Sequence, residues 1–544
     1  MPDAQHAAVR LGDTDLHVLP ERDDVHGPDE LVPGFGNTMR DGLGVRAERG
    51  GVDIAITGGL VLDPILGVRY ASIGVKDGRV VSVGRAGNPD TMDGVDVVLD
   101  VTTAVLDAGG MIVTPGGIDT HVHWLSPQVT DALLASGVTT MVSQDYGPVW
   151  NLGTNPEEGL ALAWAALEAS PINACLLVRG SSSRPEPVEA MLRAGGGGLK
   201  IHEDVGAGPV QIDTALRVCD AHDVQLAIHT DGLNEVLSVE GTLRAFAGRA
   251  VHAFHIEGAG GGHAPNLMNL AGREHVLTSS TSPTVPFGVD TRAEHEAMVA
   301  AVHVLEPGRV AGDREAIRAR VRAGTMAAEG VLHDLGIVHM LSSDSQGMGR
   351  AGEVVRRAFQ NADVMKRVRG GEDAEHDNER VLRHLAKVTI NPAITHGLAH
   401  DVGALTPGRL ADCVLWKPEL FGVRPELVVK LGLPAWGASG DPNATTALCE
   451  PVTLRPQVGG VGAAPGRLSV AFTAAAARDT ELPTTRRRSI VQNCRTIGAK
   501  DMVRNDRLAE VTVSNDGREV RVDGEPVGIE PVADVALSGR YLLG

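Results

Sequence analysis

The chain has 544 residues, which is long enough for a large core and for more than one domain. Apolar residues make up 43% of it but aromatic residues only 3%, so we expect an aliphatic core. The net charge of −20, from 69 acidic and 49 basic residues, disfavours nucleic acid and anionic membranes as partners.

The N-terminal stretch MPDAQHAAVRLGDTDL has no apolar signal core, and no run of about 18 apolar residues predicts a membrane span. The cysteines are scattered, without a CxxC pair. This pattern is typical of a reduced, cytoplasmic protein without disulfides or a thiolate metal site. The five cysteines are Cys175, Cys219, Cys413, Cys449 and Cys494.

Residues 50–110 read as short β-strands, and KDGRV within them is typical of a hairpin turn. From residue 111 onward, eight apolar strand-like runs alternate with segments that are apolar at helical spacing. This alternation predicts an α/β fold, a (β/α)8 TIM-type barrel. The eight runs are 111–124, TTMVSQD, INACLLVRG, GGLKIHE, VQLAIHT, AVHAFHIE, HVLTSS and VHMLSSDSQ.

After about residue 400 the β character returns in GALTPGRLADCVLW, and the tail AEVTVSNDGREVRVDGEPV predicts another hairpin. We expect the two chain ends to pair into a second, β-rich domain. The predicted division is 1–115 and 401–544 for the β domain with its C-terminal extension, and 116–400 for the barrel. The basic run at residues 486–488 is expected to be a solvated loop or a subunit contact.

Polar residues follow the predicted barrel strands at their C-terminal ends, where barrel enzymes place their sites. His121 and His123 lie two apart on the first strand and therefore face the same side. An HxH pair alone is a weak signal, and a single buried histidine is more often structural. Several such residues that converge on one barrel mouth nevertheless predict a metal site. The remaining members are Lys200, His229, His255 and Asp344.

Lys200 stands in the stretch GGGGLKIHEDVGAG, inside a strand that we expect to be buried on both faces. A buried ammonium is costly. The imidazole and carboxylate donors exceed what one catalytic ion needs, so two ions are predicted. A lysine that has added CO2 becomes an anionic carbamate that can bridge them. The alternative is a lysine paired with Asp204 or Glu203, or one that reaches water.

The set of HxH, lysine, two histidines and aspartate on successive strands resembles the amidohydrolase superfamily. Within it, the chain is similar to the urease catalytic (alpha) subunit family from about residue 9 to residue 544. The resemblance implies a hydrolase of linear amide C–N bonds that converts urea to ammonia and carbamate at two nickel ions. The motifs are RLGDTDL, TPGGIDTHVHW, GLKIHED, AIHTDGLNE, FHIEGAGGGHAP, SSDSQGMGRAGEV, GALTPGRLADCVLW and NCRTIGAKDMVRND.

The resemblance also implies a role for each site residue. One nickel ion would be bound by His229 and His255, the other by His121, His123 and Asp344, with carbamylated Lys200 between them. Nitrogen and oxygen donors suit nickel and zinc about equally, so nickel follows from the resemblance alone.

Further implied residues surround the substrate. His202 would donate a hydrogen bond to the urea oxygen, and backbone groups of Gly260 and Gly347 would contact the urea nitrogens. His303, on a mobile flap at about residues 286–320, would protonate the leaving ammonia. Asp204 and Arg320 would orient His303.

The sequence departs from the family pattern at three places. Val302 precedes His303 where the family commonly has cysteine, SQDYGP at residues 143–148 replaces GGGTGP, and Val205 replaces a tryptophan. Asp145 and Tyr146 are expected to reshape the pocket. The alternatives are another binuclear amidohydrolase acting on cyclic amides, a divergent urease-like subunit with weak or no urea activity, and a non-catalytic assembly subunit.

The resemblance implies partners as well. They are separate urease beta and gamma subunits, in heterotrimers that assemble into a larger trimer, and accessory proteins that insert nickel. The alternative is a self-sufficient homo-oligomer.

Overall fold

The computed structural model describes most of the chain. The described residues are 7–25, 41–145, 153–154, 156–202, 205–230, 239–259, 264, 266–302, 307–439 and 453–538.

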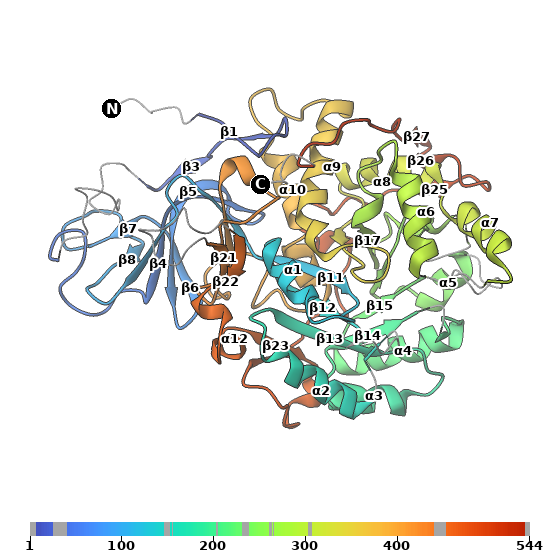
Figure 1. Ribbon diagram of the computed structural model, residues 1–544, viewed down its shortest axis with the longest axis horizontal. Coiled ribbons are helices and arrows are strands. Elements are labelled where there is room, and N and C mark those ends of the chain that lie inside the picture. Colours follow the sequence, from blue (N-terminus) through green and yellow to red (C-terminus); the bar gives the residue numbers. More distant parts are fainter. Residues whose placement is uncertain are drawn as a thin grey trace.

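Two large sheets organise the molecule, and the first contains strands from both ends of the chain. In Figure 1 its blue N-terminal strands and orange C-terminal strands lie together to the left of the barrel. The predicted pairing of the chain ends is therefore confirmed. Its main path runs β22 (Thr453–Pro456), β21 (Leu433–Ser439), β20 (Leu427–Lys430), β19 (Cys413–Trp416), β10 (Ile112–Pro115), β4 (Ile54–Asp63), β5 (Gly67–Lys76) and β3 (Arg22–Asp23), with β6 (Arg79–Gly84) on β5 and β9 (Ala104–Asp107) on β4.

The predicted KDGRV hairpin connects β5 to β6, with Lys76 opposite Arg79. Its two turn residues, Asp77 and Gly78, have φ angles of 52° and 78°. Positive φ at both central positions is the geometry of a type I′ turn, which matches the twist of the flanking strands. The Asp-Gly sequence therefore determines where the chain reverses.

The second sheet is the predicted barrel, in which eight parallel strands follow one another in chain order. Helices surround these strands (Figure 1), and every strand residue but Arg179 is buried. Burial on both faces explains why the strands read as continuous apolar runs. They are β11 (Gly117–Val122), β12 (Val138–Ser143), β13 (Asn173–Arg179), β14 (Gly198–Ile201), β15 (Leu226–Ile228), β16 (Val251–Ala253), β17 (Val276–Thr281) and β18 (Met340–Ser342).

The first and last strands meet at a closing seam, which we define as the contact of residues 121–123 with Ser345. Val122 and Ser345 form a parallel bridge. The backbone N–H of Ser345 donates to the carbonyl oxygen of His121 at 3.3 Å, and the N–H of His123 donates to that of Ser345 at 3.1 Å. The seam closes the barrel at its carboxyl end, next to the predicted metal ligands.

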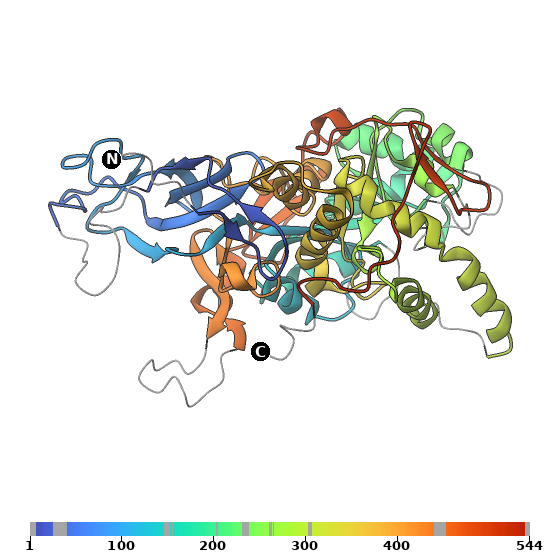
Figure 2. The same ribbon diagram turned by 90° about the horizontal axis from the view of Figure 1, so that it is seen from above.

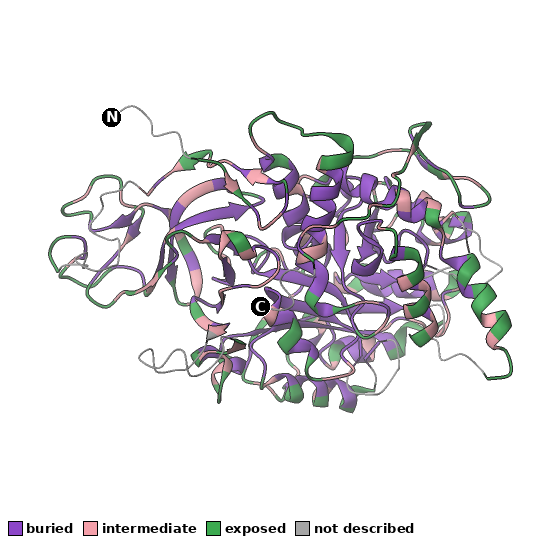
Figure 3. Cartoon of the chain, turned by 45° about the horizontal axis from the view of Figure 1, so that its top comes forward, coloured by how far each residue is buried: buried purple, intermediate pink, exposed green. Residues whose placement is uncertain are grey.

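Helices connect the barrel strands and cover their outer side. Helix α7 stands out from the end of the molecule (Figures 1 and 2), and α6 and α7 carry many of the exposed residues there (Figure 3). These two helices occupy the segment predicted as a flap. The helices are α1 (Val129–Ala135), α2 (Glu157–Leu167), α3 (Pro185–Arg193), α4 (Pro209–His222), α5 (Val239–Phe246), α6 (Thr291–Val302), α7 (Val310–Arg320), α8 (Ala323–Asp334), α9 (Val354–Arg369), α10 (Asn378–Ala386), α11 (Ile390–Thr395) and α12 (Ala464–Arg467).

Two local expectations are wrong, and a third is confirmed. The run 111–124 is not one strand: it breaks at Gly116, where any side chain would overlap Thr139, and β10 and β11 belong to different sheets. The tail does form the predicted hairpin, since Val511–Val513 pairs antiparallel with Val520–Val522, and Glu525–Val527 adds a third strand. Within the basic run, Arg486 is buried and donates hydrogen bonds to the carbonyl oxygens of Leu167, Ser170 and Ile172.

Smaller sheets complete the described chain. β23 pairs with the amino-terminal half of β13 and with β24, so the C-terminal extension joins the barrel sheet. The other short strands form separate small sheets. All the strands of these smaller sheets, with β23 and β24, are β1 (Val9–Arg10), β2 (His17–Val18), β7 (Ala86–Gly87), β8 (Val97–Val98), β23 (Val470–Thr473), β24 (Arg487–Ile490), β25 (Val511–Val513), β26 (Val520–Val522) and β27 (Glu525–Val527).

Across the described ranges, no helix is both long and apolar enough to span a membrane. Cys175, Cys219, Cys413 and Cys494 are free and buried, and burial raises the pKa of each thiol.

Candidate metal centre

The six predicted metal ligands converge at the carboxyl end of the barrel. His121 lies in β11 and His123 just beyond it, Lys200 lies in β14, and the other three follow β15, β16 and β18. Each is at most 2% exposed. The structure therefore brings together side chains that are separated by more than two hundred residues in the sequence. The six are His121, His123, Lys200, His229, His255 and Asp344.

Three imidazoles form the first donor group. His255 Nε2 lies 2.9 Å from His229 Nε2, which in turn lies 3.4 Å from His121 Nε2. The ligand atoms of all three lie within 4.8 Å of one another. Three nitrogen donors that face one point are a suitable partial shell for a divalent transition metal ion.

Asp344 forms the second donor group with His121 and His123. Its Oδ1 lies 3.2 Å from His121 Nε2 and 3.2 Å from His123 Nε2, and the three ligand atoms also lie within 4.8 Å of one another. Asp344 Oδ2 lies 3.6 Å from His255 Nε2 and so connects the two groups. The donor types and their convergence fit two adjacent metal ions.

Lys200 is fully buried, as expected for a lysine inside an apolar strand. Its Nζ lies 4.1 Å from the ring centroid of Phe254, and Phe254 stacks on His121 at 3.9 Å and 16°. No sequence pattern had selected Phe254. The alternative partners Glu203 and Asp204 lie outside the described residues.

The imidazoles differ in their affinity for protons. Burial is the largest cause that lowers the pKa of His121, His229 and His255, and the charge of Lys200 lowers it further, for His255 to about 3. These three rings are therefore neutral and offer lone pairs. Burial also lowers the pKa of His123, but hydrogen bonds to Asp145 and Asp344 outweigh burial and raise it to about 9.

Two of the ligands have a left-handed backbone conformation: φ is 50° at His255 and 54° at Asp344. Such angles are uncommon for residues other than glycine and persist where the surroundings enforce them. At Asp344, the backbone N–H groups of Gly347 and Gly349 donate to its carbonyl oxygen at 3.1 and 2.9 Å. The N–H of Met348 donates to its Oδ2 at 3.1 Å. The turn therefore holds the carboxylate in place.

Three of the residues implied in substrate binding or catalysis also lie at this mouth. His202 is buried, with its ring centroid 4.1 Å from that of His229. Gly347 packs so closely that an added Cβ would overlap Asp344 Oδ1 and lie 3.1 Å from His123 Cδ2. Arg320, buried at the end of α7, lowers the pKa of His255 through its charge. His303, Asp204 and Gly260 lie outside the described residues.

Sequence reasoning missed two nearby groups. Asp145, which was expected only to add bulk, is buried and lies 2.6 Å from His123 Nδ1 through its Oδ2. Its position directly after β12, at the same sheet edge as the ligands, was the available signal. His295 on α6 is buried, and neither ring nitrogen has a hydrogen-bond partner among the described residues. Because His295 lies within a helix and not directly after a barrel strand, its position did not indicate a place in the site.

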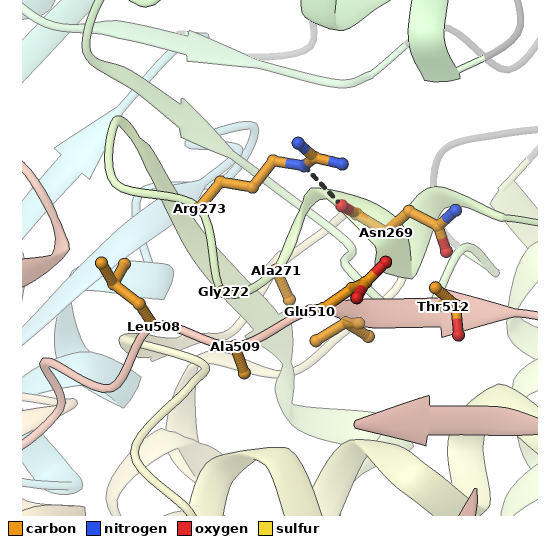
Figure 4. A pocket seen from close by; sticks show the side chains of 9 residues that line it. Asn269, Ala271, Gly272, Arg273, Leu508, Ala509, Glu510 and Thr512 are labelled. Carbon is orange, nitrogen blue, oxygen red and sulfur yellow. Dashed lines mark hydrogen bonds between the residues drawn. The ribbon is translucent and has the colours of Figure 1, made fainter. Parts of the chain in front are cut away.

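A separate cavity of about 520 Å³ lies between the segment after η2 (Leu267–Leu270) and the strand β25 (Figure 4). Its wall includes Arg273, whose Nε donates to the carbonyl oxygen of Asn269 at 2.8 Å. None of its lining residues belongs to the metal-ligand groups. This hollow is therefore distinct from the barrel mouth.

Comparison with known proteins agrees with this arrangement. Residues 112–433 match the amidohydrolase family model, and residues 3–106 match the model of the urease alpha-subunit N-terminal domain. Urease subunit alpha 1 of Streptomyces avermitilis is 52% identical over 541 residues, which cover 98% of this chain and 97% of that protein. The chain belongs to the urease alpha subunit family. Urease subunit alpha of Natronomonas pharaonis is 44% identical, over 98% of this chain and 96% of that protein.

Urease alpha subunit 2 of Streptomyces coelicolor is likewise 52% identical, over 98% of this chain and 97% of that protein. Among solved structures, a D-hydantoinase has 17% sequence identity and a TM-score of 0.48, over 71% of this chain and 95% of that chain. Membership of the urease alpha subunit family implies a binuclear metal site, and the two donor groups at the barrel mouth can provide it.

Proposed function

We propose that this chain is the catalytic subunit of a urease and hydrolyses urea to ammonia and carbamate, which then releases CO2. The observation that carries the proposal is the buried cluster at the barrel mouth, which contains four imidazoles, one carboxylate and Lys200. It occurs in a chain that is 52% identical to a urease alpha subunit over nearly its whole length.

In this proposal His229 and His255 hold one nickel ion, while His121, His123 and Asp344 hold the other. The Lys200 ammonium loses one proton, and the resulting amine adds CO2 and loses a second, so a cationic group becomes an anionic carbamate that could bridge the ions. Its burial, and the effect of its charge on the pKa of His121, His229 and His255, support this role, because an anion close to the donor groups offsets the repulsion between two cations. The donor atoms suit nickel and zinc equally, so nickel rests on family membership.

When bound, the ions would polarise the urea carbonyl and activate water, and both effects help the hydrolysis of a resonance-stabilised amide. The protein supplies the remaining contacts. His202, buried beside His229, donates a hydrogen bond to the urea oxygen. Backbone groups of Gly260 and Gly347 face the urea nitrogens. Close packing at Gly347 leaves no room for a side chain between the backbone and the ligands, which supports this placement.

The leaving nitrogen needs a proton, and His303 supplies it from the flap. The oxygen of water adds to the carbonyl carbon, the C–N bond breaks with its electron pair on nitrogen, and that nitrogen takes the proton from His303. Of the two protons that the water gives up, one restores His303 and the other is released. Ammonia and carbamate result. Asp204 and Arg320 orient His303, and the burial of Arg320 close enough to lower the pKa of His255 supports its part in the site.

The active particle contains separate beta and gamma subunits with this chain, in heterotrimers that assemble into a larger trimer. Accessory proteins insert the nickel. The basis is family membership, since the relatives are named as alpha subunits of urease.

The test is to co-express the chain with its neighbouring subunit and accessory genes in nickel-containing medium, and to purify the complex. Metal content and ammonia release from urea are measured, and ring opening of cyclic amides such as hydantoin, which releases no ammonia, is followed by chromatography. We expect two nickel ions per chain, ammonia from urea and no opening of the cyclic amides. Opening of cyclic amides without urea hydrolysis would favour another amidohydrolase. A two-metal complex inert to both would indicate a divergent subunit.

A further inference from the structure

The loop directly after β12 adds two side chains to the barrel mouth that the proposed mechanism does not use. Gln144 and Asp145 are both fully buried. They follow the carboxyl end of β12, which pairs in parallel with β11, the strand that carries His121 and leads into His123. A buried carboxylate is costly unless it has partners, so Asp145 calls for an explanation.

The partner of Asp145 is the outer nitrogen of a proposed metal ligand. Asp145 Oδ2 lies 2.6 Å from His123 Nδ1, and Asp145 Oδ1 accepts the backbone N–H of Gly153 at 3.4 Å. On the opposite edge of the same ring, His123 Nε2 lies 3.2 Å from Asp344 Oδ1. The imidazole is therefore held between two carboxylates, one on each nitrogen.

Asp145 determines which nitrogen of His123 carries the proton toward the loop. A carboxylate oxygen accepts, so Nδ1 donates to Asp145, while the Gln144 amide nitrogen lies 2.9 Å from Nε2. With a proton held on Nδ1, Nε2 is the nitrogen whose lone pair can serve the donor group of His121, His123 and Asp344. Asp145 and Gln144, which are adjacent in sequence, thus favour the same orientation of one ring.

Other ligands are held in weaker ways. His255 Nδ1 lies 3.2 Å from a hydroxyl, Thr281 Oγ1. His121 Nδ1 has no hydrogen-bond partner within the described parts of the chain, and its ring rests on Phe254. A hydrogen bond to a carboxylate is about twice as strong as one between neutral groups. His123 is thus the more firmly oriented of these ligands.

We propose that Asp145 is a positioning residue that accepts the Nδ1 proton of His123, fixes the ring, and so strengthens metal binding at the donor group of His121, His123 and Asp344. This inference rests on the proposed metal site but not on the identity of the substrate. It assigns a role to the SQDYGP loop, and it predicts that the two ions differ in their response to changes at residue 145.

The experiment uses the co-expressed complex with Asp145→Ala, Asp145→Asn or the control Thr281→Val, which removes the hydroxyl beside His255. Metal content is measured at equilibrium with increasing chelator, and the kcat and KM for urea are measured in parallel. Loss of such a partner typically weakens metal binding about 10- to 100-fold. We expect Asp145→Ala to release one of the two ions that much more readily, Asp145→Asn to have an intermediate effect, and Thr281→Val a smaller one.

Asp145→Asn keeps the shape of the side chain, so it tests the effect of Asp145 on metal binding even if Asp145→Ala does not fold. We expect kcat to fall with the metal content while KM changes less. Two ions retained with wild-type affinity in both Asp145 variants would overturn the inference, as would equal release of both ions. A wild-type complex without metal would overturn the proposed function as well. A wild-type complex with two ions and no urea hydrolysis would refute only the function, since metal release still tests Asp145.

Discussion

Gly347 offers a direct test of how closely the backbone packs against the proposed ligands. In Gly347→Ala the new Cβ would overlap Asp344 Oδ1 and lie 3.0 Å from Asp344 Cγ and 3.1 Å from His123 Cδ2. Carbon contacts are relaxed at about 3.5–4.0 Å, so the carboxylate has to move by roughly 1 Å. The turn hydrogen bonds at Asp344 oppose that movement.

A misplacement of about 1 Å in a reacting group can lower a rate about 10²-fold. We therefore expect Gly347→Ala to lower kcat by about that factor and to weaken metal retention. The assay is ammonia release at saturating urea, with metal content measured on the same sample. Gly352→Ala is the matched control, because it makes the same substitution five residues later and its Cβ meets nothing within 4 Å.

Both substitutions restrict the unfolded chain to the same extent, so a general effect on stability would appear in both. If Gly347→Ala kept the kcat and metal content of Gly352→Ala, the reasoning from close packing would be refuted. A loss shared equally by the two variants would also count against it.

Three further predictions follow from the proposed function. Lys200→Ala should abolish metal binding and activity, because the bridging anion is lost; two tightly bound ions in this variant, measured by elemental analysis, would contradict the carbamate. His303→Ala should lower kcat ~10²–10⁴-fold with the metal content unchanged, since a positioned proton donor is removed; a nearly unchanged kcat would place that role elsewhere. The chain alone should not form a fully metallated, active particle in size-exclusion chromatography with light scattering, whereas the co-expressed complex should; an active lone chain would contradict the partner requirement.

The sequence was sufficient to predict the barrel and the convergence of the six side chains at its mouth, because both follow from a simple geometric rule. Parallel strands buried on both faces read as apolar runs, and residues at their carboxyl ends meet at one edge. That rule located His229 and Asp344 without knowledge of any contact. It could also have selected Asp145, but whether a polar residue beyond a strand turns inward depends on the loop path and on a partner such as His123.

Other features could not be predicted, because they depend on contacts between distant segments. At the break at Gly116, the side chain of Thr139 in β12 leaves no room for a Cβ. Arg486 belongs to a run that looks solvated, but it is buried because three backbone carbonyl groups around the end of α2 accept its hydrogen bonds. The position of Phe254 under Lys200 likewise exists only once β14 and β16 are assembled. The residues adjacent to each position in the sequence do not predict such contacts.

The closing seam affects the order in which the protein can mature. His121 lies in the first barrel strand and His123 just beyond it, whereas Asp344 follows the last strand, and hydrogen bonds of Ser343 and Ser345 with residues 119–123 join the two sides. During synthesis, the donor group that contains all three is incomplete until nearly two thirds of the chain has left the ribosome. An ion bound there would hold together the two ends of the segment from His121 to Asp344, and closing so long a segment costs conformational entropy. Backbone amides along the seam should therefore exchange hydrogen faster in the metal-free chain than in the metal-bound chain. Metal binding would then stabilise the closed barrel.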